Sequence, residues 1–155
     1  MEWAALAVIA VVCFGVAAVG GAVTEPNISW LDELDRPSWR PPNWIFGPVW
    51  TVLFAAMTVA AWLVWRTGPG ETEVLFALGL FALQLLLNAA WSWIFFGRRS
   101  PGGALAEIPF LWAAILATIL AFHPISPLAA WLLVPYLAWV TFAAVLNAEI
   151  WRRNR

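Results

Sequence analysis

Hydrophobic positions fall into five long runs separated by short polar segments, and we expect membrane spans near residues 3–23, 44–65, 74–96, 104–122 and 128–151. Each run has about the twenty residues that a helix needs to cross a hydrocarbon core of about 30 Å. Turn-forming or charged residues fill most of the gaps, as in "RTGPGETE", "GRRSPGG" and "HPISP". Because helices satisfy their own backbone groups in lipid, the pattern predicts an all-α integral membrane protein with a single five-helix transmembrane domain over residues 1–155.

The first run and the segment after it differ from the others. A secretory signal opens with positive charge, whereas this chain opens with Glu2, so we expect the first run to remain as a transmembrane helix. About twenty residues separate the first two runs, which is long for a connection in a compact bundle. We expect this long first loop to act as a lid.

Composition narrows the function classes. The chain is 63% hydrophobic and 11% charged, too few charges to cover a soluble globule of 155 residues, so the lipid bilayer is its expected surrounding. The net charge of −1 gives no basic face for nucleic acid. We find no cluster of metal ligands and no Ser–His–Asp or Cys–His set, so the sequence indicates no metal, no required cofactor and no conventional catalytic apparatus.

The arginines predict an orientation. Seven of the eight lie in the first loop, the third loop and the C-terminal end, which share one side of a five-span protein. The positive-inside rule then places the long first loop and the C-terminus in the cytoplasm and the N-terminus outside.

Polar residues within the spans follow helical spacing. Gln84, Asn88 and Ser92 are four residues apart on one face of the third run, and Trp139, Ala143 and Asn147 make a second such stripe on the fifth. Pro135 precedes the second stripe and favours a kink beside it. These stripes fit either hydrogen bonds between helices or the polar wall of a mostly apolar ligand cavity, and the two roles are compatible.

The thirteen tryptophans divide by depth. Trp44 falls near a span end, where an aromatic belt is the default explanation. Trp50 and Trp139 are deeper, and a deep indole needs a partner for its N–H or a polar cavity beside it, so both are pocket candidates.

Three motifs carry a resemblance to a known family: "RPSWRPPNWIFGPVWTVLF", "LQLLLNAAWSWIFFG" and "ISPLAAWLLVPYLAWVTFAAVLN". With the helix count and loop lengths, they resemble the tryptophan-rich sensory proteins and the mitochondrial translocator protein (peripheral benzodiazepine receptor), the TspO/MBR family. One departure is the Trp30–Leu31 pair, where the family commonly has Trp-Tyr, so a contact through that tyrosine hydroxyl is absent.

The resemblance implies a bundle of five helices, often a homodimer, with a pocket below the first loop. It implies a membrane receptor or carrier that binds porphyrins such as protoporphyrin IX and haem, with a role in tetrapyrrole transport, sensing or regulation. Propionates could reach Arg36 or Arg40. Two alternatives stay open: a light-dependent enzyme that degrades porphyrin with pocket tryptophans, and a structural or partner-binding membrane protein. The ligand-binding positions that the resemblance implies are Trp39, Trp44, Trp50, Gln84, Asn88, Ser92, Phe95, Trp139 and Ala143.

Overall fold

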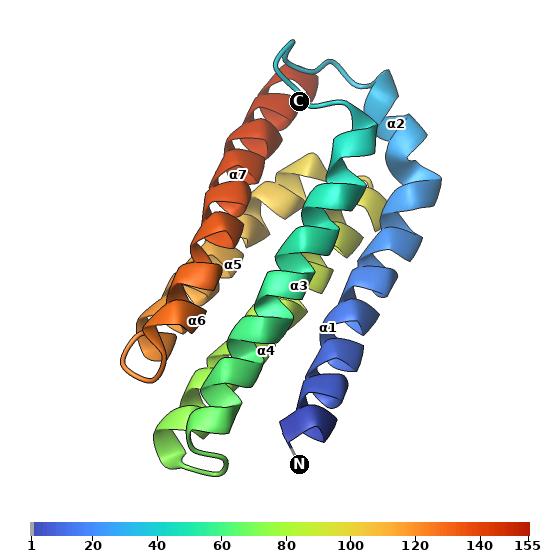
Figure 1. The fold of residues 1–155 in the computed structure, drawn as a ribbon. Coiled ribbons are helices and arrows are strands. Elements are labelled where there is room, and N and C mark those ends of the chain that lie inside the picture. The colour runs from blue at the N-terminus through green and yellow to red at the C-terminus, as the bar shows by residue number, and fades with distance from the viewer. Residues whose placement is uncertain (1) are drawn as a thin grey trace.

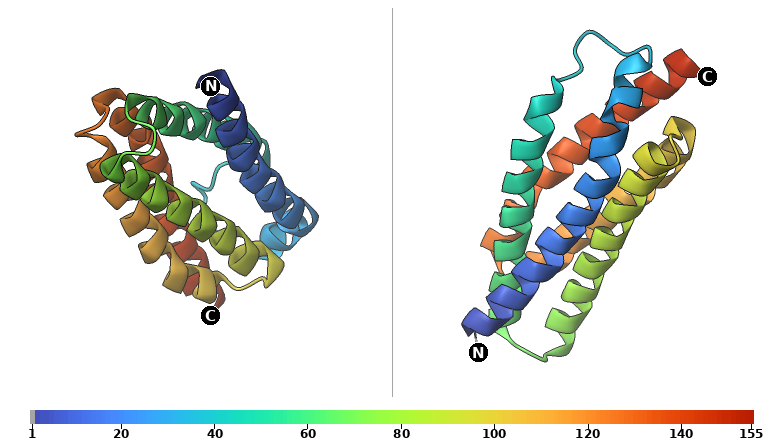
Figure 2. Two further views of the ribbon diagram at one scale, coloured as in Figure 1. Left: turned by 90° about the horizontal axis from the view of Figure 1, so that it is seen from below. Right: turned by 90° about the vertical axis from the view of Figure 1, so that its right-hand side faces the viewer.

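Five helical spans form an elongated bundle in the computed structural model, which describes residues 2–155 (Figure 1). Each span is long and apolar enough to cross a membrane, and the described residues contain no strand. The expected all-α, five-span architecture is therefore confirmed. The termini lie at opposite ends of the bundle, and the first loop lies at the C-terminal end (Figures 1 and 2). The helical elements are α1 (Glu2–Thr24), η1 (Glu25–Asn27), α2 (Ile28–Glu33), α3 (Asn43–Thr67), α4 (Thr72–Ser92), η2 (Trp93–Gly97), α5 (Pro101–Phe122), α6 (Pro127–Leu132) and α7 (Val134–Asn154).

The segment after the first span is more helical than the sequence indicates. The short 3-10 turn η1 and the helix α2 continue the first span to Glu33, so only residues 34–42 lack helical structure before α3 begins. Leu31 of α2 is buried in a small apolar cluster with residues from η2, α5 and α7. This contact explains why α2 packs against the bundle, because Leu31 buries an apolar side chain there.

The third and fifth spans are each irregular at one point. The third span ends in η2, a π-helical turn that carries Phe95 and Phe96 inward. The fifth is divided at Leu133 into α6 and α7, with Pro135 in the first turn of α7. Pro135 has no backbone N–H to donate, so the break follows from the proline as the sequence predicts.

The main apolar core is formed by α3, α4, α5 and the fifth span, around side chains such as Met57, Ile115 and Phe122. By contrast, Cys13 alone is buried among the residues of α1. Near its start, α1 is held to the end of α3 by a stacked Trp3–Trp62 pair, with ring centroids 5.6 Å apart, and by an ion pair between Glu2 and Arg66 at 3.1 Å. The first helix therefore packs against the outside of the core and leaves room beside it.

Candidate functional site: an intramembrane cavity

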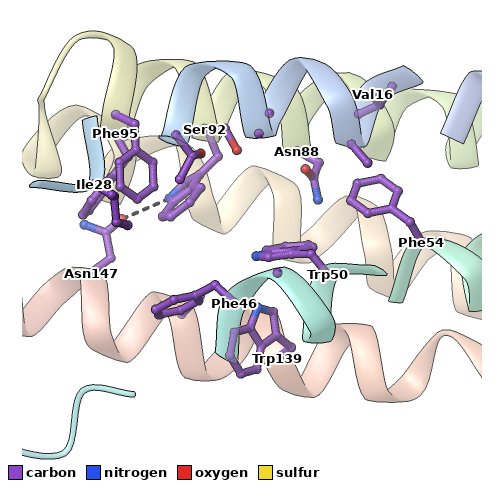
Figure 3. A pocket seen from close by; sticks show the side chains of 18 of the residues that line it. Val16, Ile28, Phe46, Trp50, Phe54, Asn88, Ser92, Phe95, Trp139 and Asn147 are labelled. Carbon is purple, nitrogen blue, oxygen red and sulfur yellow. Dashed lines mark hydrogen bonds between the residues drawn. The ribbon is translucent and has the colours of Figure 1, made fainter. Parts of the chain in front are cut away.

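A cavity of about 340 Å³ lies between α1 and the rest of the bundle, toward the end that carries the first loop (Figure 3). Its volume falls in the range of about 300–1,000 Å³ that is typical of small-molecule sites. Small residues of α1, Gly20 and Gly21, form part of one wall. A Cβ atom at Gly21 would meet no other atom within 4 Å, so the first helix leaves this part of the wall open. Ile28 and Leu31 of α2 close the wall toward the first loop.

Aromatic side chains of α3 and α7 form the opposite wall. Trp50 and Trp139 both line the cavity, with ring centroids 6.4 Å apart and planes at 89°. Phe46 packs edge-on against Trp139 at 5.8 Å (Figure 3). Between residues 2 and 155, neither indole N–H of this tryptophan pair donates a hydrogen bond to another residue. The pair therefore offers two perpendicular aromatic faces and two free donors to a flat ligand.

The polar wall of the cavity contains two asparagines with different partners. Asn147 is buried, and its Oδ1 accepts a hydrogen bond from the Trp91 indole N–H at 3.1 Å while its Nδ2 donates to the carbonyl oxygen of Pro101 at 2.8 Å. Asn88 donates from Nδ2 to the Tyr136 hydroxyl at 2.8 Å. Its Oδ1 makes no hydrogen bond within the part of the chain that the structure describes. Asn147 thus links α4, α5 and α7, whereas Asn88 leaves one acceptor on the wall.

No charged side chain occurs among the described residues that line the cavity. The two arginines expected to contact propionates, Arg36 and Arg40, lie outside the lining, where both contact Asp32 of α2. Arg40 forms an ion pair with the Asp32 carboxylate at 3.4 Å and also donates to Asn43. Burial lowers the pKa of the Arg40 guanidinium, and the Asp32 carboxylate opposes that shift. Arg40 and Asn43, which both contact the Asp32 carboxylate, hold α2 to the start of α3.

Six of the nine ligand-binding positions implied by the resemblance line the cavity: Trp50, Asn88, Ser92, Phe95, Trp139 and Ala143. The structure places the other three elsewhere. Gln84 is buried between α3, α4 and α7, below the cavity lining, where it accepts a hydrogen bond from Tyr136. Trp44 is 73% exposed, as an interface anchor would be. Trp39 packs edge-on against Phe142, a lining residue, with centroids 5.7 Å apart. Their roles in binding stay predictions.

Several lining residues were not among those positions. Asn147 continues the stripe of Trp139 and Ala143 by one more turn, so the four-residue spacing was a signal for it. Trp91 lies beside Ser92 and stacks on Phe95 with centroids 5.0 Å apart. The contribution of α1 and α2 has no comparable signal in the sequence, because small and aliphatic residues there fit lipid contact equally well.

Together, the fold and the site define an integral, multi-pass membrane protein whose five spans enclose an aromatic, uncharged cavity. Comparison with known proteins identifies the family. The model of the TspO/MBR family matches residues 7–152, and the chain belongs to that family.

Its relatives include animal and bacterial proteins. The chain is 47% identical to the human translocator protein over 129 residues, covering 83% of this chain and 76% of that one. It is 46% identical to the tryptophan-rich protein TspO of Chlorobaculum tepidum over 143 residues, covering 92% and 90% of the two chains. It is 38% identical to the tryptophan-rich sensory protein of Cereibacter sphaeroides over 155 residues, covering 99% and 94%. The family resemblance inferred from the three motifs is confirmed.

Proposed function

We propose that the protein is a membrane receptor or carrier that binds porphyrins, such as protoporphyrin IX and haem, in the cavity beside α1, with a role in tetrapyrrole transport, sensing or regulation. The observation that carries the proposal is the perpendicular pair of Trp50 and Trp139 in the cavity lining. A tetrapyrrole is a flat π-system, and indole faces stabilise such a ring by stacking and edge contacts. The chain belongs to the TspO/MBR family, and the resemblance to that family implies the same class of ligand.

The charged propionates of a porphyrin must leave the cavity, because a carboxylate is costly to bury without a partner. Arg36 and Arg40 lie beyond α2 and already contact Asp32, so propionate binding there would replace the Asp32 contacts with bonds to the ligand. We propose this exchange at the loop end of the site.

The first loop is proposed as the lid of the cavity. Ile28 and Leu31 of α2 form the loop-side wall, so movement of α2 with residues 34–42 would open it. Asn154, near the end of α7, holds this segment: its Oδ1 accepts from the Asp35 backbone N–H at 3.0 Å, and its Nδ2 donates to the Asp35 carbonyl at 2.6 Å. Arg153 adds an ion pair to Asp35 at 3.6 Å. These contacts, which we call the Asp35–Asn154 clasp, would have to separate for the lid to open.

We also propose that this end faces the cytoplasm. Seven of the eight arginines belong to segments at the end that carries the first loop, which favours a cytoplasmic location for that end under the positive-inside rule (Figure 2). The N-terminus would then face outward. A homodimer, implied by the family resemblance, remains a prediction.

The test is a titration with protoporphyrin IX and haem in detergent, followed by porphyrin absorbance so that the signal does not depend on protein fluorescence. Trp50→Phe and Trp139→Phe should each weaken binding about two- to tenfold, since aromatic contacts contribute about 0.5–1.5 kcal/mol beyond their area. Trp93→Phe is the matched control, because Trp93 is 53% exposed and outside the lining. Unchanged affinity in the Trp50→Phe, Trp139→Phe double variant would overturn the proposal.

A second candidate function is light-dependent porphyrin degradation, favoured by the two indoles at the cavity wall. A bound photosensitiser in oxygen can oxidise a neighbouring indole or be oxidised itself without an acid–base set. Illumination of the complex under oxygen distinguishes this function from binding alone. Porphyrin absorbance that decays at the same rate with the Trp50→Phe, Trp139→Phe variant as with the wild-type protein contradicts it.

A further inference from the structure

Beside the cavity, four buried side chains form one hydrogen-bonded chain between α3, α4 and α7. Gln84 donates from Nε2 to the sulfur of Met57 at 3.9 Å, and its Oε1 accepts from the Tyr136 hydroxyl at 2.7 Å. The oxygen of the same hydroxyl accepts from Asn88 Nδ2 at 2.8 Å. All four are buried, and only Asn88 lines the cavity. Two residues outside the site, Gln84 and Tyr136, are thus connected to one residue inside it.

The chemistry of Met57 sets the direction of this chain. A thioether sulfur accepts weakly and cannot donate, so the amide of Gln84 must present its NH₂ group to Met57 and its oxygen to Tyr136. The single hydroxyl hydrogen of Tyr136 then goes to Gln84. The opposite direction would place the Gln84 oxygen against the sulfur, which pairs two acceptors. The Gln84–Met57 contact therefore fixes the amide orientation of Asn88, because Tyr136 passes the direction of the hydrogen bonds from Gln84 to Asn88.

The consequence lies in the cavity. With its Nδ2 directed to Tyr136, Asn88 presents Oδ1 as the group without a partner among residues 2–155. The Asn88 side chain projects from α4 into the cavity, between Ser92 and Phe54 (Figure 3). Ser92, one turn along α4, has a hydroxyl that donates or accepts as the ligand requires. Asn88 has no such freedom while Tyr136 holds its amide.

We propose that Asn88 makes the cavity selective for ligands that bring an N–H or O–H donor to the α4 wall, and that Tyr136 and Gln84 act as positioning residues for this selectivity. The proposal rests on the cavity being a ligand site, as in the proposed function, but does not require the ligand to be a porphyrin. A ligand that lacks the donor leaves a desolvated carbonyl oxygen unpaired, and sites built for a hydrogen bond reject such analogues.

The experiment compares carbazole with N-methylcarbazole, two flat tricyclic rings that differ in one N–H donor. Binding of both is measured by calorimetry in the same micelles, and the ratio of their affinities is compared between the wild-type protein and its variants, so that partition into detergent cancels. The wild-type protein should favour carbazole about two- to tenfold beyond this partition, as expected for one net hydrogen bond.

Three variants locate the effect. Asn88→Leu should remove the preference. Tyr136→Phe should reduce it while both probes still bind, because the freed amide can turn its NH₂ to the ligand. Thr67→Val is the matched control, since Thr67 lies outside the cavity lining and bonds the backbone carbonyl of Leu63 in its own helix, and this variant should keep the preference.

Each result decides a point. An affinity ratio that is the same in the wild-type protein and in Asn88→Leu overturns the selectivity, and this holds whether or not Tyr136→Phe folds. A ratio lost in Asn88→Leu but unchanged in Tyr136→Phe overturns the positioning role. Carbazole preference without protoporphyrin binding would reject the proposed porphyrin function alone, whereas porphyrin binding without any preference rejects this inference alone.

Discussion

Two asparagines face the same cavity from neighbouring walls, and their surroundings give them different tasks. Asn147 has both halves of its amide occupied by Trp91 and Pro101, so it connects three spans. Asn88 has one half bonded to Tyr136, and its Oδ1 has no partner among the residues that the structure describes. In lipid, no water replaces a lost hydrogen-bond partner. An amide whose two groups are both bonded to protein stabilises the bundle, whereas an amide with one unbonded group is free to contact a ligand.

The sharpest test of this comparison is Asn147→Leu. The substitution leaves the part-buried Trp91 indole N–H without its acceptor and removes the Asn147 donor from the Pro101 carbonyl, and an unsatisfied buried group costs about 1–3 kcal/mol. We expect a loss of about 2 kcal/mol in the free energy of unfolding, near the upper end for polar contacts in membranes. Thermal unfolding in detergent measures it. Asn88→Leu is the control and should lose less stability; the reverse order would break the comparison.

A smaller effect is expected for Gln84→Met, which keeps the side-chain volume and removes the acceptor of the Tyr136 hydroxyl. The free energy of unfolding should fall by about 1 kcal/mol, the usual net worth of one hydrogen bond. Because Gln84 lies outside the lining and acts on a ligand only through Tyr136 and Asn88, protoporphyrin affinity should stay within about twofold of the wild-type value, a difference of less than 0.5 kcal/mol. This result would separate helix packing from ligand contact.

If both Gln84→Met and Asn88→Leu reduce stability while ligand affinity stays constant, the polar stripes of the cavity are structural, as the alternative of a structural or partner-binding membrane protein holds.

The smallest effect is expected for a third amide, Asn154. Both groups of its amide bond the backbone of Asp35, but the residue is exposed. Asn154→Ala removes both hydrogen bonds that Asn154 contributes to the Asp35–Asn154 clasp while leaving every lining residue in place. We expect ligand dissociation about two- to threefold faster, since hydrogen bonds in contact with water contribute little. Stopped-flow release of protoporphyrin into excess apoprotein measures it. Arg152→Ala is the matched control, because Arg152 pairs with Glu149 rather than Asp35. Equal release rates in the two variants would mean that the clasp does not hold the lid.

Much of the fold follows from the sequence because lipid imposes a simple rule. Apolar runs of sufficient length predict five spans, and Pro135 predicts the interruption that divides the last span at Leu133. The π-helical turn of η2 and the helix α2 were not predicted. Both depend on tertiary contacts, such as the burial of Leu31 against the α7 end of the bundle, that leave no periodic mark of their own.

The site is predictable in part for a related reason. Four-residue spacing places Gln84, Asn88 and Ser92 on one helical face, and the structure keeps them there. Spacing does not tell how far a cavity extends along that face. The cavity reaches Asn88 and Ser92, whereas Tyr136 and Met57 fill the space beside Gln84. Likewise, the sequence does not tell whether a basic residue close to pocket residues is free to bind a ligand. Arg36 and Arg40 both already contact Asp32.

Cys13 has a practical consequence. It is the only cysteine of the chain and the one buried residue of α1, and its neighbours on that helix, Phe14 and Ala17, line the cavity. A thiol-reactive reagent can therefore modify the natural protein only when the first helix moves away from the bundle. The labelling rate of Cys13 thus reports how often α1 opens away from the bundle, without any engineered probe. The change in this rate on adding a ligand gives the free energy that couples occupancy of the cavity to the packing of α1.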